Sequence, residues 1–95
     1  MTGSTRSSAG LDERRRRLLY RSWHRGMREM DLVMGRFADA TIADLTEAEL
    51  AEFESLSDLP DPDLYAWVTG DAAVPRDVDS PLFRKLCAFH GKGAA

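Results

Sequence analysis

The sequence predicts an all-α fold, a compact five-helix bundle formed by a single domain. Apolar residues recur at helical spacing in several segments, no segment alternates convincingly with a period of two, and cap signals precede several of the apolar stripes. A chain of 95 residues is long enough for one domain. We divide it into a polar tail at 1–10, a helical domain at 11–91 and a short tail at 92–95, and we expect both tails to be disordered.

The first two helices are expected at 11–25 and 27–40, with Gly26 between them. A glycine adopts the left-handed conformation that ends many helices without a steric cost, so we expect Gly26 to end the first helix. The arginines at 14–17 point in successive directions around that helix and are expected to form a solvated face. The two apolar stripes are Leu11, Leu18, Leu19 and Trp23, and then Met30, Val33, Met34 and Phe37.

The start of the third helix carries the clearest local signal in the chain. Thr46 and Glu49 have the spacing of a capping box, and Leu45 and Leu50 have that of a hydrophobic staple. The inner side of this helix is expected to contain Leu50, Phe53 and Leu56. The glutamates expected to face water or a partner are Glu47, Glu52 and Glu54.

The fourth and fifth helices are both predicted from a cap residue followed by proline. Asp61 is expected to cap the fourth helix, with Pro62 at its first position and Gly70 at its end. Ser80 and Pro81 repeat this arrangement before the fifth helix. The apolar residues of the two helices are Leu64, Tyr65, Trp67 and Val68, and then Leu82, Phe83, Leu86 and Phe89.

Charge is distributed unevenly along the chain. Residues 1–36 contain nine arginines and four acidic residues, a net charge of +5, whereas residues 37–79 contain one arginine and twelve acidic residues, a net charge of −11. Residues 80–95 add +3. Such asymmetry favours association with a complementary protein surface, and the acidic middle of the chain would repel a phosphate backbone.

The chain offers little for a catalytic or cofactor site of its own. A domain of this size has little room for a large pocket beside its core, and no glycine-rich phosphate loop is present. No nucleophile, base and acid occur at a recognisable spacing. Cys87 is the only cysteine, and His24 and His90 lack further ligands at zinc-site spacing. We therefore expect a binding module that is not an enzyme and that binds no cofactor or metal by itself.

The sequence also bears on location. No apolar run approaches the ~20 residues that span a bilayer, and the N-terminus has no apolar signal core. A single cysteine cannot form an intrachain disulfide. We expect a soluble protein of a reducing compartment, most simply the bacterial cytoplasm.

The junction between the first two helices is the main candidate site, because it places both charge signs around a glycine. Glu29 is expected in the first turn of the second helix, where the helix dipole favours a carboxylate, with Arg25 as its counter-charge. One interpretation is a capped turn whose surface ion pair contributes about 0 to 1 kcal/mol. The other is a fixed polar surface for a partner. The candidate partner-binding residues are Arg25, Gly26, Met27, Arg28, Glu29 and Asp31.

Two groups of residues resemble the signatures of a known family. The first is Arg25-Gly26-Met27-Arg28-Glu29, with Arg21-Ser22 before it and Asp31-Leu32 and Gly35-Arg36-Phe37-Ala38 after it. The second is Asp61-Pro62-Asp63-Leu64-Tyr65-x-Trp67. Over about residues 14–90 the chain resembles the succinate dehydrogenase flavinylation factors, the SdhE family, whose hallmark is Arg-Gly-x-x-Glu.

The resemblance implies an assembly factor that binds the flavoprotein subunit of succinate dehydrogenase and promotes covalent attachment of FAD to a histidine of that subunit. The flavoprotein subunit of fumarate reductase is a further candidate client. The resemblance also implies that Arg25, Gly26 and Glu29 face the client, and that Tyr65 and Trp67 lie near that surface or in the core. We expect Trp67 in the core, because a small protein can rarely spare a tryptophan.

The main alternative is a small helical nucleic-acid-binding regulator that uses the arginine-rich first helix, and a third interpretation is an enzyme subunit or a generic adaptor. The arginines at 14–17 favour this alternative. The acidic middle of the chain and the lack of a convincing recognition helix oppose it.

Overall fold

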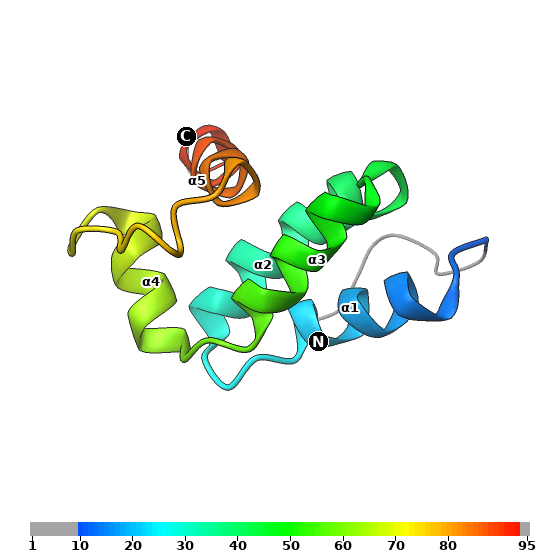
Figure 1. The fold of residues 1–95 in the computed structure, drawn as a ribbon. Helices are drawn as coiled ribbons and strands as arrows, with labels where there is room; N and C mark the ends of the chain where they lie inside the picture. Colours follow the sequence, from blue (N-terminus) through cyan, green and yellow to red (C-terminus); the bar gives the residue numbers. More distant parts are fainter. Residues whose placement is uncertain (1–9, 94–95) are drawn as a thin grey trace.

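The fold of the computed structural model consists of helices joined by short connections (Figure 1). The structure describes residues 10–93, and side chains as far as residue 91. Within this part no strand occurs, and the predicted all-α, five-helix fold is confirmed. Residues 1–9 and 94–95, which belong to the expected tails, lie outside the described residues. The elements are α1 (Glu13–Trp23), α2 (Arg28–Thr41), the 3₁₀ turn η1 (Ile42–Asp44), α3 (Glu47–Ser57), α4 (Asp61–Thr69) and α5 (Pro81–Gly93).

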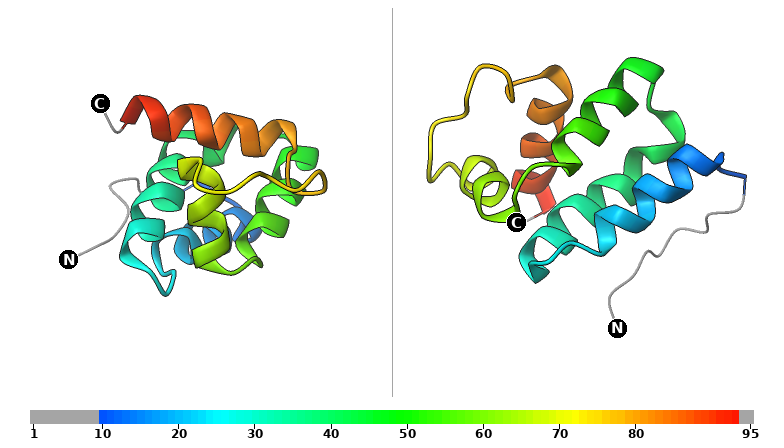
Figure 2. Two further views of the ribbon diagram at one scale, coloured as in Figure 1. Left: turned by 90° about the vertical axis from the view of Figure 1, so that its left-hand side faces the viewer. Right: turned by 60° about the horizontal axis from the view of Figure 1, so that its bottom comes forward.

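Helix α2 is the centre of the arrangement. It packs against α1, α4 and α5, while α1 also contacts α3, and α3 and α4 contact α5. Figure 2 shows α1 running alongside α2 and α3, with α5 packed across α2, α3 and α4. The first turn of α2 lies near α4 (Figure 1).

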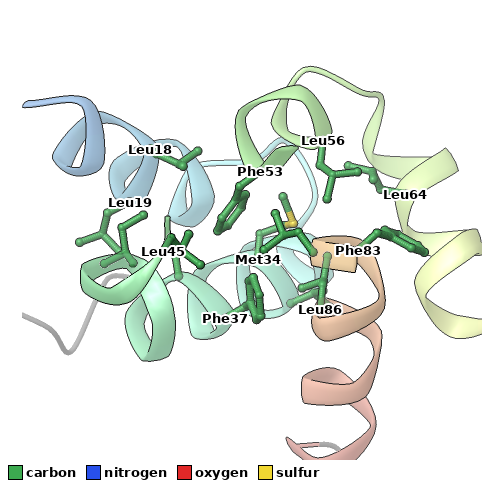
Figure 3. Close-up of a cluster of buried hydrophobic side chains, with 14 of the residues drawn as sticks. Leu18, Leu19, Met34, Phe37, Leu45, Phe53, Leu56, Leu64, Phe83 and Leu86 are labelled. Atoms are coloured by element: carbon green, nitrogen blue, oxygen red, sulfur yellow. The ribbon is translucent and has the colours of Figure 1, made fainter. Parts of the chain in front are cut away.

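One hydrophobic core joins all five helices (Figure 3). The stripes predicted for the helices supply it: Met34 and Phe37 from α2 meet Phe53 from α3 and Leu86 from α5. The ring centroids of Phe37 and Phe53 are 5.5 Å apart, a separation typical of favourable aromatic pairs. Most core positions expected from helical periodicity are thus confirmed, whereas Tyr65, Trp67 and Phe89 are only partly buried.

Most helix starts follow the local signals in the sequence. The capping box is present: the Glu49 backbone N–H donates to Thr46 Oγ1 over 3.1 Å, and the Thr46 N–H donates to Glu49 Oε1 over 2.9 Å. Ser80 Oγ accepts from the Phe83 N–H, as its cap position predicts. Glu52, which we expected to face water or a partner, instead accepts from the Leu82 N–H at the start of α5.

Two local expectations are wrong. Helix α1 ends at Trp23, and Gly26 has no positive φ, so this glycine does not end the helix in a left-handed conformation. Gly70 does end α4 in that way, with φ of 86°. Asp61 is the first residue of α4, yet its carboxylate does not cap the helix, because it binds residues of another segment.

The arginine run of α1 is not a uniform solvated face. Arg14 donates to Glu47 and Glu54, and so ties α1 to both ends of α3. Arg15 donates to the carbonyl oxygens of Ile42 and Leu45, which connects α1 to the α2–α3 connection. The expectation that residues 14–17 are a solvated face is therefore wrong for these two arginines.

Substitution of Gly35 should destabilise the fold. A Cβ at position 35 would lie 2.5 Å from Cε2 and 2.7 Å from Cε3 of the buried Trp23 ring, so one of the two helices must move. We expect Gly35→Ala to lower the free energy of unfolding by about 1–3 kcal/mol in urea denaturation. Gly91→Ala is the matched control in α5, where nothing lies within 4 Å of an added Cβ, and it should not be destabilising. Equal stability of the two variants would contradict this close α1–α2 contact.

The Arg14–Glu54 pair should make stability depend on pH. Hydrogen bonding from Arg14 is the main cause that lowers the pKa of Glu54 below its usual 4.5. A carboxylate with a lowered pKa in the folded state stabilises the fold above its unfolded pKa, and this contribution is lost as the pH falls through the folded pKa. Glu54→Gln should therefore reduce the thermal midpoint at about pH 7 and have a smaller effect below about pH 4. Arg14→Gln should act alike, and a reduction that does not vary with pH would contradict the assignment.

Candidate partner-docking site

The predicted site lies where α1 turns into α2, beside the start of α4 (Figure 1). Residues 24–27 form the turn, and the N–H of Arg25 donates to Asp31 Oδ1 over 2.6 Å. Asp31 lies in the first turn of α2, so this bond fixes the direction in which the helix leaves the turn. The junction therefore has a defined shape within the fold.

The Arg25 side chain points inward. Only 8% of it is exposed, and it forms an ion pair with Asp61, whose side chain is 11% exposed. Its Nη1 donates to the Ser57 carbonyl over 2.6 Å, and its Nη2 donates to the Leu59 carbonyl over 2.9 Å. The expected pairing of Arg25 with Glu29 is wrong, because Asp61 is its acidic partner. A guanidinium with all three nitrogens occupied in this way has little left to offer another protein.

Gly26 is exposed, and nothing in its own fold requires a glycine there. Its φ is not positive, and an added Cβ would lie 3.9 Å from Asp61 Oδ2, an ordinary van der Waals distance. Its N–H donates to the same oxygen over 3.0 Å, which holds the backbone in place. The structure thus presents a fixed stretch of backbone without a side chain at the surface.

The remaining candidates of the first signature divide by exposure. Arg28 and Glu29 are exposed in the first turn of α2, and neither forms an ion pair within the described part of the chain. Met27 is partly buried against the core, and Asp31 is partly buried by its bond to Arg25. Gly26, Arg28 and Glu29 are therefore the outward residues of the site, and we call them the junction surface.

An apolar groove of about 260 Å³ continues from the junction surface. Four of its residues recur on one face of α2 at helical spacing, and the others come from α4 and α5. Tyr65 is thus placed beside the candidate site. Trp67, which we expected in the core, is only half-buried against it and does not line the groove. The lining residues are Glu29, Leu32, Val33, Arg36, Tyr65, Phe89 and His90.

The two sequence signatures form one structural unit. Arg25 and Gly26 of the first both bind Asp61 of the second, although they are 36 and 35 residues away from it. Glu29 and Tyr65, again one from each signature, line the same groove. Asp61, Phe89 and His90 are site residues that no sequence pattern singled out as such. Only the spacing of α2 residues from Glu29 onward could have indicated the groove.

The site has the features of a protein interface. It combines exposed backbone, unpaired charges of both signs and a shallow apolar groove. Between residues 10 and 91 no three His, Cys, Asp or Glu side chains converge to hold a metal ion. In the described part of the chain, none of the helices has the length and apolar character needed to cross a bilayer.

Comparison with known proteins supports the two signatures. The family described as "Flavinator of succinate dehydrogenase" matches residues 16–90. The chain is 39% identical over 82 residues to "Succinate dehydrogenase assembly factor 2, mitochondrial" of Dictyostelium discoideum, covering 86% of this chain and 57% of that protein. It is 35% identical over 88 residues to "FAD assembly factor SdhE" of Acetobacter pasteurianus, covering 87% of this chain and 81% of that protein.

The coverage differs between these relatives. The chain spans only about half the length of the mitochondrial proteins, and 43% of the Scheffersomyces stipitis one, to which it is 44% identical over 64 residues. The family match nevertheless includes both signatures and every helix from α2 to α4 in full. The chain therefore belongs to the family of succinate dehydrogenase flavinators.

Proposed function

We propose that this chain is an assembly factor that binds the flavoprotein subunit of succinate dehydrogenase and promotes covalent attachment of FAD to it. Family membership and the names of the relatives support this function. The structural observation that carries the proposal is Gly26, an exposed stretch of backbone held in place although its own fold does not require a glycine. A partner that must approach this backbone closely would require that no side chain be present at position 26.

The proposed role is positioning. In the client, a histidine must meet the 8α carbon of the flavin ring, and the client holds both groups. Holding reacting groups close to their reactive geometry contributes about 7–11 kcal/mol in favourable cases. A factor that clamps two domains of the client at a productive angle supplies this contribution without itself touching the ring.

The client surface would meet the junction surface directly. Arg28 and Glu29 have no ion pair within the described residues, so their charges are available for charge-assisted hydrogen bonds to a partner. Arg25 has a different role, because it is buried and holds Gly26 and α4 together through Asp61.

We further propose a bacterial cytoplasmic location, no FAD bound without the client, and the fumarate reductase flavoprotein as a second client.

The nucleic-acid alternative is not favoured. Arg14 and Arg15 donate to acidic side chains and backbone carbonyls of this chain, and Arg17 pairs with Glu13. Three of the four arginines that suggested it are therefore already paired. The negative charge of segment 37–79 would also repel a phosphate backbone.

Gly26→Arg should abolish client docking while the variant still folds. An arginine there would cover the exposed backbone, and the added Cβ itself makes only ordinary contacts within this chain. Succinate dehydrogenase flavoprotein produced with the variant should lose its covalent flavin, measured as ultraviolet fluorescence of the denatured subunit. Covalent flavin survives denaturation, whereas bound flavin is released.

Gly91→Arg is the matched control for this experiment. Position 91 is an exposed glycine of α5 with open space around an added Cβ, and it lies outside the groove. This variant should support normal flavinylation. Normal flavinylation by a folded Gly26→Arg protein would refute the assignment of the junction surface.

Arg25 and Glu29 should respond differently to substitution. Arg25→Ala leaves Asp61 without its buried counter-charge and removes the donor to Asp61 Oδ1 and to two carbonyl oxygens, so we expect a loss of about 3 kcal/mol in urea denaturation. Glu29→Lys should cost less than about 1 kcal/mol, because only its interaction with the helix dipole is lost. Both variants should lower flavinylation: Arg25→Ala because it destabilises the fold, and Glu29→Lys because it weakens docking of the client. An Arg25→Ala protein as stable as the unchanged chain would show that Arg25 does not hold the junction.

A further inference from the structure

The groove on α2 carries opposite charges at its two ends. Glu29 and Arg36 are seven residues apart on the same helix, which places them about 10 Å apart along its axis. Leu32 and Val33 lie between them, and Tyr65 and Phe89 contribute aromatic rings from α4 and α5. The groove is therefore an apolar slot with an acidic end next to the junction surface and a basic end farther along α2.

The charges at both ends are free to meet a partner. Glu29 and Arg36 are exposed, and neither has an ion-pair partner among residues 10–91. This contrasts with Arg14, Arg15, Arg17, Arg21, Arg25 and Arg84, all of which pair with acidic residues of this chain. Leu32, Tyr65 and Phe89 are each only partly buried, so the apolar slot is also accessible.

We infer that this groove binds a short segment of the flavoprotein subunit, and the inference rests on the proposed function. The segment presents one or two apolar side chains to the slot, a basic residue to Glu29 and an acidic residue to Arg36. It lies next to the client backbone that meets Gly26, because Glu29 belongs to both surfaces. The groove thus fixes the direction in which the segment runs along α2.

The size and charge of the groove favour a protein segment over other occupants. Its volume of about 260 Å³ is below the ~300–1,000 Å³ of ordinary small-molecule and cofactor pockets, and suits a few side chains. A polyanion such as a lipid surface or nucleic acid would meet Glu29 at one end. Only an occupant with both charge signs complements the two ends, and a protein segment provides them.

The test measures binding of purified succinate dehydrogenase flavoprotein subunit that holds FAD without the covalent bond. Leu32→Ser removes an apolar wall of the groove, and Arg36→Glu reverses its basic end. We expect each to weaken binding by about tenfold, because central apolar and charged contacts of an interface dominate its affinity. Circular dichroism and thermal unfolding establish that each variant is folded.

Two matched controls separate the groove from general effects. Val74→Ser changes a partly buried apolar residue in the α4–α5 connection, outside the groove. Arg16→Glu makes the same change of charge as Arg36→Glu at an exposed position of α1. Both controls should bind within about twofold of the unchanged chain, as ordinary surface positions do.

Photo-crosslinking from position 40, an exposed alanine of α2 one turn beyond Arg36, then identifies the occupant and leaves Arg36 in place. A crosslink to an acidic segment of the flavoprotein is expected, and a basic substitution of that acidic residue should restore binding of Arg36→Glu. Crosslinks between two copies of this chain would overturn the inference. The inference would also be overturned if the Leu32→Ser and Arg36→Glu proteins bound the subunit as well as the unchanged chain does, in an experiment where the unchanged chain binds and promotes flavinylation. An unchanged chain that neither binds the subunit nor promotes flavinylation would instead refute the proposed function itself.

Discussion

The buried ion pair between Arg25 and Asp61 is the constraint on which the site depends. Arg25 belongs to the α1–α2 junction, Asp61 begins α4, and the guanidinium also binds carbonyl oxygens at the end of α3 and in the α3–α4 connection. Removing two charges from water is costly unless the geometry is good and further hydrogen bonds satisfy both groups. Here the added acceptors and the N–H of Gly26 do so. One interaction therefore holds three segments that are far apart in the sequence.

This constraint gives the charged residues of the first signature different roles. Arg25 and Asp31 act inside the molecule, where they fix the shape of the turn, whereas Arg28 and Glu29 remain exposed. The motif therefore has two layers: its buried residues hold the turn in place, and its exposed residues form the surface above them. The same division explains why two signatures occur: Asp61 of the second is needed to hold Arg25 and Gly26 of the first. Tyr65 then extends the surface into the groove.

Local rules predicted the parts of the fold that depend on neighbouring residues. The apolar stripes, the capping box at Thr46 and the end of α4 at Gly70 were predicted correctly because each depends on residues a few positions apart. The conformation of Gly26 and the role of Asp61 were not, because contacts between distant segments replaced the local cap that each residue would otherwise make. The groove could not be predicted either, since three helices contribute to it and only the α2 residues share a pattern.

The groove on α2 and the turn just before it bear on how a small helical protein could orient the proposed client. α2 packs against α1, α4 and α5, so the helix is supported on several sides. Gly26 lies in the turn just before α2, and the groove runs along α2 from Glu29 to Arg36. A single contact would fix a position and leave the client free to rotate about it. A second contact farther along α2 removes that rotation, and fixing an angle is what the proposed positioning role in flavin attachment requires.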